Sequence, residues 1–296
     1  MHNRDMTIRV PFTKMHGAGN DFIVLDARSG LPDHLLRPEQ IRRLSDRRFG
    51  IGADQILLVE NSPTDQADFV YRIFNSDGQE VEQCGNGARC FARYVVDQGL
   101  IKGPAVRVLT KAGLIRPVVE ANGEVTVDMG PPQLTAQSLP FQVEGLCSQL
   151  AGQQTLYELN APHDQPRWFG PVSMGNPHLV NWVEDTQTAP VGPVGQWLQS
   201  HDRLPHRVNV GFGQIKSPTA MSLRVFERGA GETLACGTGA CAAVVSGVAQ
   251  GLLAAGQPVA VQTAGGRLTI RWSGDPQDSV WMTGPATTVF KGEIEL

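Results

Sequence analysis

The segment RIFNSDGQEVEQCGNGAR at residues 72–89 recurs in altered form as RVFERGAGETLACGTGA at residues 224–240. In both segments an arginine precedes a cysteine by 12 residues, and Gly-x-Gly follows the cysteine. At this offset of 152 residues, Asn75 aligns with Glu227 and Glu80 aligns with Glu232. A repeat with so long a period indicates two copies of one domain, because solenoid repeats are much shorter.

Four further fragments repeat in the same order along the chain. TKAGL at Thr110 matches TAGGR at Thr263, and VDMGPP around Met129 matches VWMTGP around Met282, both at an offset of 153. GNDFIVLD at Gly19 matches GNPHLVNW at Gly175 at an offset of 156, and RFGIGADQI at Arg48 matches RVNVGFGQI at Arg207 at 159. We therefore predict a first lobe over residues 7–132 and a second over 133–285. The region 133–171 has no counterpart and either joins the lobes or begins the second.

The local patterns in each copy predict many strands and one prominent helix. Short β-rich runs such as FIVLDA, QILLVE and DFVYRIF are separated by turn residues. After the first CG motif, Ala88, Phe91, Ala92 and Val95 form one apolar helical face, and residues 240–245 are apolar all round. The predicted fold class is α+β, with two pseudo-symmetric lobes, each a mainly antiparallel sheet wrapped around a central helix.

Composition excludes several functional classes. The net charge of −4 offers no basic excess for nucleic acid, and we expect no nucleic-acid partner. No run of 18 apolar residues and no signal-peptide pattern occurs, so we expect no membrane partner and a cytoplasmic location. Five widely spread cysteines do not form a disulfide pattern. Zinc-ligand spacings and the dinucleotide and P-loop glycine patterns are absent, so we expect no metal.

Cys84 and Cys236 each precede Gly-x-Gly at a predicted helix start. Helix N-termini carry partial positive charge, which lowers the pKa of a cysteine there from ~8.5 toward neutrality. Two such thiols related by pseudo-symmetry are expected to face each other across one cleft. Such a pair could invert a carbon next to a carboxylate, one acting as base and the other as acid, without an imine-forming cofactor. Cys90, Cys147 and Cys241 are expected to be small buried packing residues.

The chain also carries KMHGAGNDF at Lys14, GIGADQ at Gly50, CGNGARC at Cys84, MGNPH at Met174 and ERGAGETLACGTGACA at Glu227. These motifs resemble those of the diaminopimelate epimerase family over nearly the whole chain. The resemblance implies interconversion of LL- and meso-2,6-diaminopimelate without pyridoxal phosphate, for lysine and peptidoglycan synthesis. It also implies a homodimer and a final strand, about residues 286–296, that returns to the first lobe. Trp281 stands where some relatives carry a tyrosine at a dimer contact.

By position in these motifs, the resemblance implies that Cys84 and Cys236 are the catalytic thiols. His178 and Glu227 are the positions expected to tune the pKa values of the thiols. The residues expected to bind substrate are Asn20, Gln55, Asn75, Gly85, Asn86, Asn176, Asn209, Glu227, Arg228, Gly237 and Thr238. The adjacent opposite charges of Glu227 and Arg228 suit the distal amino-acid end of the substrate, because a guanidinium binds a carboxylate bidentately.

Simpler interpretations of these residues remain open. Asparagines near strand ends often serve turns, a histidine after proline is usually in a surface loop, and Glu227–Arg228 could be a solvated ion pair. Two other functions also fit the cysteines. One is a proline or hydroxyproline racemase of the same fold, whose substrates lack a distal charged end. The other is a redox sensor in which Cys84 and Cys236 form a disulfide.

Overall fold

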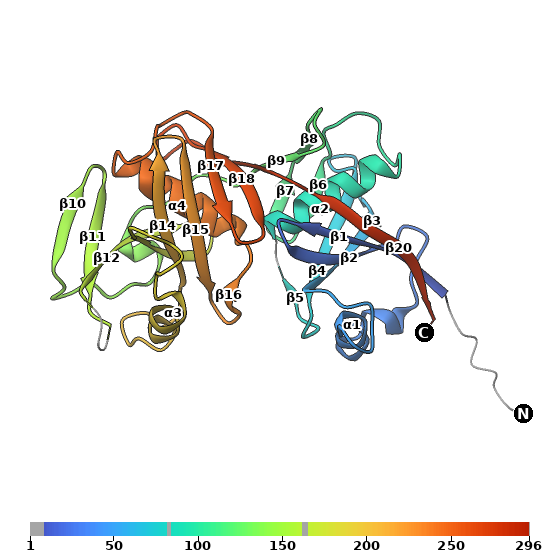
Figure 1. The fold of residues 1–296 in the computed structure, drawn as a ribbon. Helices are drawn as coiled ribbons and strands as arrows, with labels where there is room; N and C mark the ends of the chain where they lie inside the picture. The colour runs from blue at the N-terminus through green and yellow to red at the C-terminus, as the bar shows by residue number, and fades with distance from the viewer. Residues whose placement is uncertain (1–8, 82–83, 162–164, 296) are drawn as a thin grey trace, which may run out of the picture. The chain divides into compact units, whose positions relative to one another are not determined.

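The computed structural model describes residues 9–81, 84–161 and 165–295 and divides the chain into two compact units (Figure 1). Unit 1 extends to Val127 and resumes at Pro285, and unit 2 runs from Asp128 to Gly284. The first boundary lies at 127/128, five residues before the one expected from the repeat. Unit 2 is therefore an insertion in the chain of unit 1.

Unit 1 is built on a sheet with the strand order β20-β1-β2-β3-β4-β6-β7, and β5 also pairs with β4. The pairs β2–β3 and β4–β6 are parallel and the others are antiparallel, as the fold class predicts. The strands are β1 (Arg9–Gly17), β2 (Asn20–Asp26), β3 (Gln55–Asn61), β4 (Phe69–Asn75), β5 (Glu80–Val81), β6 (Val108–Thr110), β7 (Gly113–Ile115) and β20 (Thr287–Glu295). A short antiparallel pair, β8 (Val118–Val119) and β9 (Val125–Asp128), follows β7.

The sheet of unit 1 carries a helix on each face. The α1 helix (Pro38–Ser45) places Ile41 and Leu44 in a core cluster with Ile23 and Ile56. The α2 helix (Gly85–Asp97) packs on the opposite face, where Phe91 meets Tyr71 edge-on with ring centroids 5.1 Å apart. Because side chains alternate across a strand, each strand of this sheet contributes to both layers. A short 3-10 helix, η1 (Asp33–Leu36), precedes α1.

Unit 2 repeats this plan. Its strand order is β10-β11-β12-β13-β14-β15-β17-β18-β19, β16 pairs with β15, and only β13–β14 and β15–β17 are parallel among these pairs in the described residues. The strands are β10 (Ser148–Ala151), β11 (Gln154–Leu159), β12 (Arg167–Ser173), β13 (Pro177–Trp182), β14 (Asn209–Ser217), β15 (Ala220–Glu227), β16 (Gly231–Thr233), β17 (Val259–Thr263), β18 (Gly266–Arg271) and β19 (Trp281–Gly284).

The helices of unit 2 also lie on both faces of its sheet. The α3 helix (Val191–Gln199) packs Val194 and Leu198 against Phe169 and Phe212. The α4 helix (Gly237–Ala249) is buried along almost its whole surface, because β12, β13, β14 and β18 curve around it. This confirms the prediction of a sheet wrapped around a central helix. A 3-10 turn, η2 (Ala136–Ser138), and β10 and β11 occupy the region that has no counterpart in the repeat.

Strand register defines which residues of the two units are equivalent. Phe22 lies opposite Gln55 between β2 and β3, and His178 lies opposite Asn209 between β13 and β14. Gln55 therefore corresponds to Asn209, at an offset of 154. The sequence alignment of RFGIGADQI with RVNVGFGQI at 159 was wrong, because it paired Gln55 with Gln214 through a chance similarity of Gly and Gln positions.

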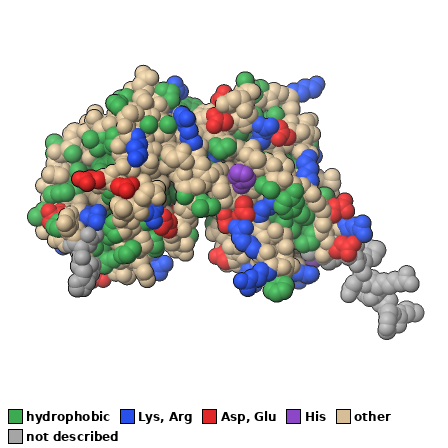
Figure 2. Space-filling view, in the orientation of Figure 1, with side chains coloured by type: hydrophobic (Ala, Val, Ile, Leu, Met, Phe, Trp, Pro, Cys, Tyr) green, Lys and Arg blue, Asp and Glu red, His purple; other side chains and the backbone are tan. Residues whose placement is uncertain are grey.

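Cys90 and Cys241 are fully buried in α2 and α4, as predicted, whereas Cys147 is exposed, so the expectation of burial was wrong for it. On the face drawn in Figure 2, acidic and basic side chains are interspersed over both units. Within the described ranges, no helix is long and apolar enough to cross a membrane.

Candidate active site

Cys84 is the N-cap residue of α2, which begins at Gly85 as the sequence predicts. The glycines matter here because the chain passes close to its neighbours: a Cβ on Gly87 would overlap the hydroxyl of Tyr71 beneath the first turn. The first backbone N–H groups of a helix have no intrahelical partner. Gly85 and Asn86 therefore begin a helix whose N-terminus can receive a carboxylate.

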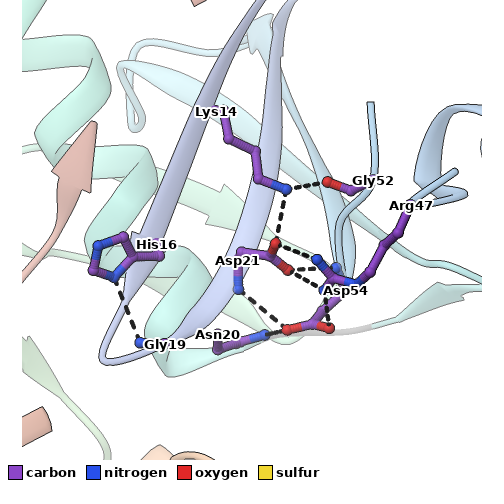
Figure 3. Close-up of polar contacts among 8 residues, drawn as sticks. All are labelled: Lys14, His16, Gly19, Asn20, Asp21, Arg47, Gly52 and Asp54. Carbon is purple, nitrogen blue, oxygen red and sulfur yellow. Dashed lines mark hydrogen bonds and ion pairs between the residues drawn. The ribbon is translucent and has the colours of Figure 1, made fainter. Parts of the chain in front are cut away.

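One asparagine amide contacts the thiol of Cys84, and a second asparagine supports the first. Cys84 Sγ donates to Asn20 Oδ1 at 3.7 Å, and Asn86 Nδ2 donates to the same oxygen at 3.2 Å. Asn20 Nδ2 donates in turn to Asp54 Oδ2 at 2.9 Å (Figure 3). The structure thus brings Cys84, Asn20 and Asn86 together, although they come from β2 and the start of α2.

Gln55 and Asn75 form a second amide pair in unit 1. They lie opposite each other on β3 and β4, and Gln55 Nε2 donates to Asn75 Oδ1 at 2.8 Å. Gln55 Oε1 is buried without a hydrogen-bond partner in the described part of the chain. A buried amide oxygen without a partner is costly, so this pair is suited to receive an ammonium or N–H donor.

In unit 2, Cys236 is the N-cap residue of α4, which begins at Gly237. Cys236 is 4% exposed, and its Sγ lies 3.6 Å from Thr238 Oγ1. Burial raises the pKa of Cys236 well above its ordinary value, and the nearby charge of Glu227 raises it further. Hydrogen bonding from Thr238 and from the Gly239 amide lowers the pKa by less. The helix start does not lower the pKa of this thiol as the sequence predicted, because desolvation outweighs it.

A buried histidine supports the amide next to Cys236. Asn176 Nδ2 donates to Thr238 Oγ1 at 3.2 Å, which leaves Asn176 Oδ1 to accept from His178 Nε2 at 3.0 Å. His178 lies in β13 and is 1% exposed, so the surface-loop alternative is wrong. Burial, together with the charge of Arg228, lowers the pKa of His178 to about 3, and the imidazole is neutral at neutral pH.

Asn209, Glu227 and Arg228 lie together at the ends of β14 and β15. Asn209 Oδ1 accepts from the Arg228 backbone N–H at 2.9 Å, and the Arg228 guanidinium donates to the His206 carbonyl at 3.3 Å. Glu227 accepts a short hydrogen bond from the Thr233 hydroxyl. No salt bridge in the described residues joins Glu227 to Arg228, so the interpretation of the two as a mutual ion pair is wrong.

Sequence reasoning missed three residues that contact this set. Asp54 accepts from Asn20, Arg89 donates to Asn86 Oδ1 at 2.9 Å, and Thr233 donates to Glu227. All three lie inside the motifs GIGADQ, CGNGARC and GAGETL, so membership of the motif was the available signal. Their side-chain types alone gave no indication of a role, because exposed aspartates and buried arginines occur in many structural settings.

The family model described as diaminopimelate epimerase matches residues 12–135 and 171–289. The chain belongs to the diaminopimelate epimerase family. The unmatched residues 136–170 fall within the region 133–171 that has no counterpart in the repeat, and they include β10 and β11.

Curated relatives of the family are similar over almost their whole length. A diaminopimelate epimerase of Laribacter hongkongensis is 56% identical over 290 residues, covering 98% of this chain and all of the relative. One from Herminiimonas arsenicoxydans is 54% identical over 289 residues, with the same coverage.

Solved structures show the same fold at low identity. A phenazine biosynthesis protein of the PhzF family from Bacillus anthracis has a TM-score of 0.70 at 17% identity, covering 98% of this chain and all of that one. A hydroxyproline epimerase from Agrobacterium vitis, with bound trans-4-hydroxy-L-proline, has a TM-score of 0.68 at 17% identity, covering 97% and 91%. At such identities the likeness is one of fold alone.

Proposed function

We propose that the protein is an isomerase that interconverts LL- and meso-2,6-diaminopimelate, with Cys84 and Cys236 as the two proton-transferring groups. The observation that carries the proposal is the pair of cysteines at matched N-cap positions of α2 and α4, in a chain of this family. Lysine and peptidoglycan synthesis are the pathways that such an activity serves.

The chemistry requires a base and an acid on opposite faces of the α-carbon. One cysteine, as thiolate, removes the α-proton and becomes a thiol, and the electron pair is held as an enolate-like carbanion. The other cysteine, as thiol, donates its proton to the opposite face and becomes the thiolate. The net change is inversion of one carbon, and the two sulfurs have exchanged protonation states. Each direction of the reaction starts from the state in which the other direction ends.

The helix N-termini supply the charge stabilisation that this step needs. We propose that the reacting carboxylate binds the N–H groups at Gly85 and Asn86 and at Gly237 and Thr238. Backbone amides at a helix start stabilise the charge that develops toward the enolate. With this stabilisation and two thiols, the reaction has no step that calls for pyridoxal phosphate, and the proposal includes no cofactor.

The remaining residues are assigned to the distal end of the substrate and to the thiols. Arg228 suits the distal carboxylate, and the unpartnered Gln55 Oε1 suits an ammonium N–H. Asn20, Asn75, Asn176 and Asn209 are assigned as amide contacts. Glu227 raises the pKa of Cys236, and neutral His178 fixes the amide of Asn176 beside it.

Isotope incorporation tests the two-thiol proposal directly. LL-diaminopimelate is incubated with the reduced enzyme in deuterated water without pyridoxal phosphate, and the meso product is analysed by mass spectrometry and NMR. We expect one deuterium at the inverted carbon, because the donated proton comes from a thiol that exchanges with solvent. Product without deuterium would overturn the mechanism.

A substrate comparison separates this function from its nearest alternative. trans-4-Hydroxy-L-proline is assayed in parallel, because a protein that shares the fold binds it. We expect turnover of diaminopimelate only, since Arg228 and Glu227 serve a charged distal end that proline lacks. Turnover of hydroxyproline alone would replace the proposed substrate.

The proposal extends to assembly and location. We propose that the protein is a cytoplasmic homodimer, as the family resemblance implies. Light scattering during size-exclusion chromatography measures the assembly, and Trp281→Ala tests the expected dimer contact. A protein that stays monomeric at all concentrations would remove the dimer from the proposal.

A further inference from the structure

A run of hydrogen bonds links four side chains beneath Cys84, and its two ends are chemically fixed. Arg89, at one end, is a donor only, and Asp54, at the other, is an acceptor only when ionised. Between them lie the amides of Asn86 and Asn20. The distances are 2.9 Å from Arg89 to Asn86, 3.2 Å from Asn86 to Asn20 and 2.9 Å from Asn20 to Asp54.

These fixed ends determine which way each amide points. Because Arg89 can only donate, Asn86 must turn its oxygen toward the guanidinium and its nitrogen toward Asn20. Because Asp54 can only accept, Asn20 must turn its nitrogen toward the carboxylate. Asn20 Oδ1 is then left facing Cys84 Sγ and accepts the S–H at 3.7 Å. Reversing either amide would oppose two donors or two acceptors.

Both ends of this run are themselves held in place. Arg89 is fully buried and also donates to the Pro285 carbonyl at 3.3 Å. Asp54 exchanges hydrogen bonds with Asp21: the Asp54 N–H donates to Asp21 Oδ1 and the Asp21 N–H donates to Asp54 Oδ2. Arg47 donates to both carboxylates at 2.7–2.8 Å (Figure 3).

Asp21 is the partly buried centre of this cluster. Its side chain is 15% exposed and meets Lys14, 9% exposed, at 2.7 Å. Hydrogen bonds from Arg47 and Lys14 outweigh the effect of burial and hold the pKa of Asp21 well below its usual range. Lys14 also donates to the Gly52 carbonyl, next to the loop that carries Asp54. The loop is thereby anchored to β1 and β2.

We propose that Asp54 and Arg89 are positioning residues that set the amide orientation of Asn20 and thereby keep a carbonyl oxygen, not an N–H, on the Cys84 thiol. This rests on the proposed function in that Cys84 is a reacting thiol. A carbonyl oxygen accepts from the protonated thiol and repels the thiolate. The arrangement therefore favours Cys84 in its proton-donating form and aims the S–H along a defined direction.

The other titratable groups near Cys84 do not compete with this effect. Tyr71 on β4 and Cys90 on α2 both interact electrostatically with Cys84. Burial raises the pKa of Tyr71 well above its ordinary value and that of Cys90 to about 12. Both are neutral across the range in which cysteines are alkylated. Hydrogen bonds with Asp21 raise the pKa of Arg47 above its ordinary value, and the pKa of Asp21 is lowered, so Arg47 stays cationic and Asp21 stays anionic throughout that range.

The test measures Cys84 alone, in the reduced full-length protein without substrate. Alkylation by iodoacetamide is followed from about pH 6 to 10 by mass spectrometry of the Cys84 peptide, in ~0.3 M salt to screen long-range charge. Asp54→Asn lets the Asn20 amide turn its N–H toward the sulfur. We expect the half-maximal pH of alkylation to fall by roughly half a unit to one unit.

A double-mutant cycle shows whether the effect passes through Asn20. The same Asp54→Asn change is made in an Asn20→Ala background, where we expect less than a third of the shift. Asp77→Asn is the matched charge control, because Asp77 is exposed in the same unit and its carboxylate accepts from the Gln79 backbone N–H at 2.8 Å. We expect it to leave the Cys84 profile within ~0.2 units.

Three results would overturn the proposal: an unchanged profile in Asp54→Asn, an equal shift in the Asn20→Ala background, or an equal shift in Asp77→Asn. Arg89→Lys, checked for folding by circular dichroism, keeps the positive charge but loses the planar guanidinium contact with Asn86, and is expected to shift the profile in the same direction. The alkylation experiments use no diaminopimelate. If they give the expected shifts in a protein that does not epimerise diaminopimelate, that result contradicts the proposed function and leaves the positioning role supported.

Discussion

The two units hold equivalent cysteines in equivalent backbone positions and surround them with different chemistry. In unit 1, Cys84 contacts the amide of Asn20, and the charges of Asp54, Asp21 and Arg47 lie behind that amide. In unit 2, the carboxylate of Glu227 acts directly on Cys236, and the supporting group behind Asn176 is a neutral histidine. The two units thus share the cysteine at the helix start and differ in the polar and charged groups that surround its thiol.

Individual equivalences show how the difference arises. Asn20 corresponds to Asn176 and Asn86 to Thr238, so each unit keeps a polar pair beside its thiol. Phe22, fully buried, stands where unit 2 has His178, and Asn75 stands where unit 2 has Glu227. In unit 1 the charged groups lie in the loop before β3 and at Asp21. The residue equivalent to Asp21 in unit 2 is Pro177. One duplicated scaffold therefore holds two thiols in different electrostatic surroundings, as the proposed roles of acid and base require.

The largest expected effect comes from the thiols themselves. Cys84→Ala and Cys236→Ala should each lower kcat/KM for epimerisation by at least ~100-fold, since each removes one proton-transfer group. Activity is measured from LL to meso by chromatography. Cys147→Ala, at an exposed cysteine in unit 2, is the matched control and should leave kcat/KM within about twofold. Near-normal turnover in either active-site variant would break the equivalence of the two cysteines.

Replacing His178 with phenylalanine, the residue at the equivalent position of unit 1, is expected to change how the stability of the protein depends on acid pH. Because the pKa of His178 in the folded protein is about 3, below its ordinary 6.5, the unfolded chain binds a proton that the folded chain excludes between those values. The free energy of unfolding must therefore fall as pH falls through this window. In His178→Phe this loss is absent, so urea midpoints should fall less between about pH 7 and 4 than in wild type.

The control for this experiment is His206→Gln, which removes an exposed histidine from the same unit. It should follow the wild-type pH dependence. The activity of His178→Phe should fall by roughly tenfold at neutral pH, because Asn176 loses the group that fixes its amide. An unaltered pH dependence of stability in His178→Phe would contradict the assignment of a neutral buried imidazole.

Glu227→Gln brings unit 2 closer to unit 1 by exchanging a carboxylate for an amide. The negative charge of Glu227 raises the pKa of Cys236, so its removal should move Cys236 alkylation to lower pH by about one unit. Burial remains, so the midpoint should stay above that of an exposed cysteine. Glu232→Gln, on the neighbouring strand β16 but in an ion pair with Arg224, should leave the Cys236 profile unchanged. Equal shifts in both variants would mean that general charge, not contact, controls Cys236.

The smallest effect is expected at β20, the strand that joins the sheet of unit 1 although it follows unit 2 in the chain. Arg9 and Glu295 join β1 and β20 at 2.9 Å, but their side chains are 69% and 59% exposed. Glu295→Gln should change the unfolding free energy by no more than about 0.5 kcal/mol. Thermal unfolding checks this, and a loss several times larger would show that side-chain charge, not strand pairing, retains β20.

Much of this architecture could be predicted because the repeat and the helix starts have recognisable local sequence patterns. The Cys-Gly-x-Gly pattern located the first residues of α2 and α4, and apolar spacing identified their buried faces. The equivalence of Gln55 and Asn209 could not be found in this way. It depends on strand register, and the loops before β3 and β14 differ in length and sequence.

The electrostatics of the site were the least predictable part. The sequence places Cys236 at a helix N-terminus, which favours a thiolate, but its burial and the approach of Glu227 arise from tertiary packing of β15 against α4. His178 likewise follows a proline, typical of a loop, yet it lies inside β13. Asp54 and Arg89 gain their roles only through Asn20 and Asn86, which are distant from Asp54 along the chain.

The pairing of β20 with β1 also dictates an order of assembly on the ribosome. Strand β1 pairs with β20 from Arg9 to His16, with an irregularity of register between Lys14 and Met15. Lys14, which anchors Asp21 and the loop of Asp54, therefore belongs to a strand whose partner is synthesised after the whole of unit 2. Unit 2 is continuous and can fold as soon as it emerges, whereas unit 1 must wait with an unpaired edge until residues 287–295 are released. During synthesis, the half of the protein that is translated first is the half that is completed last.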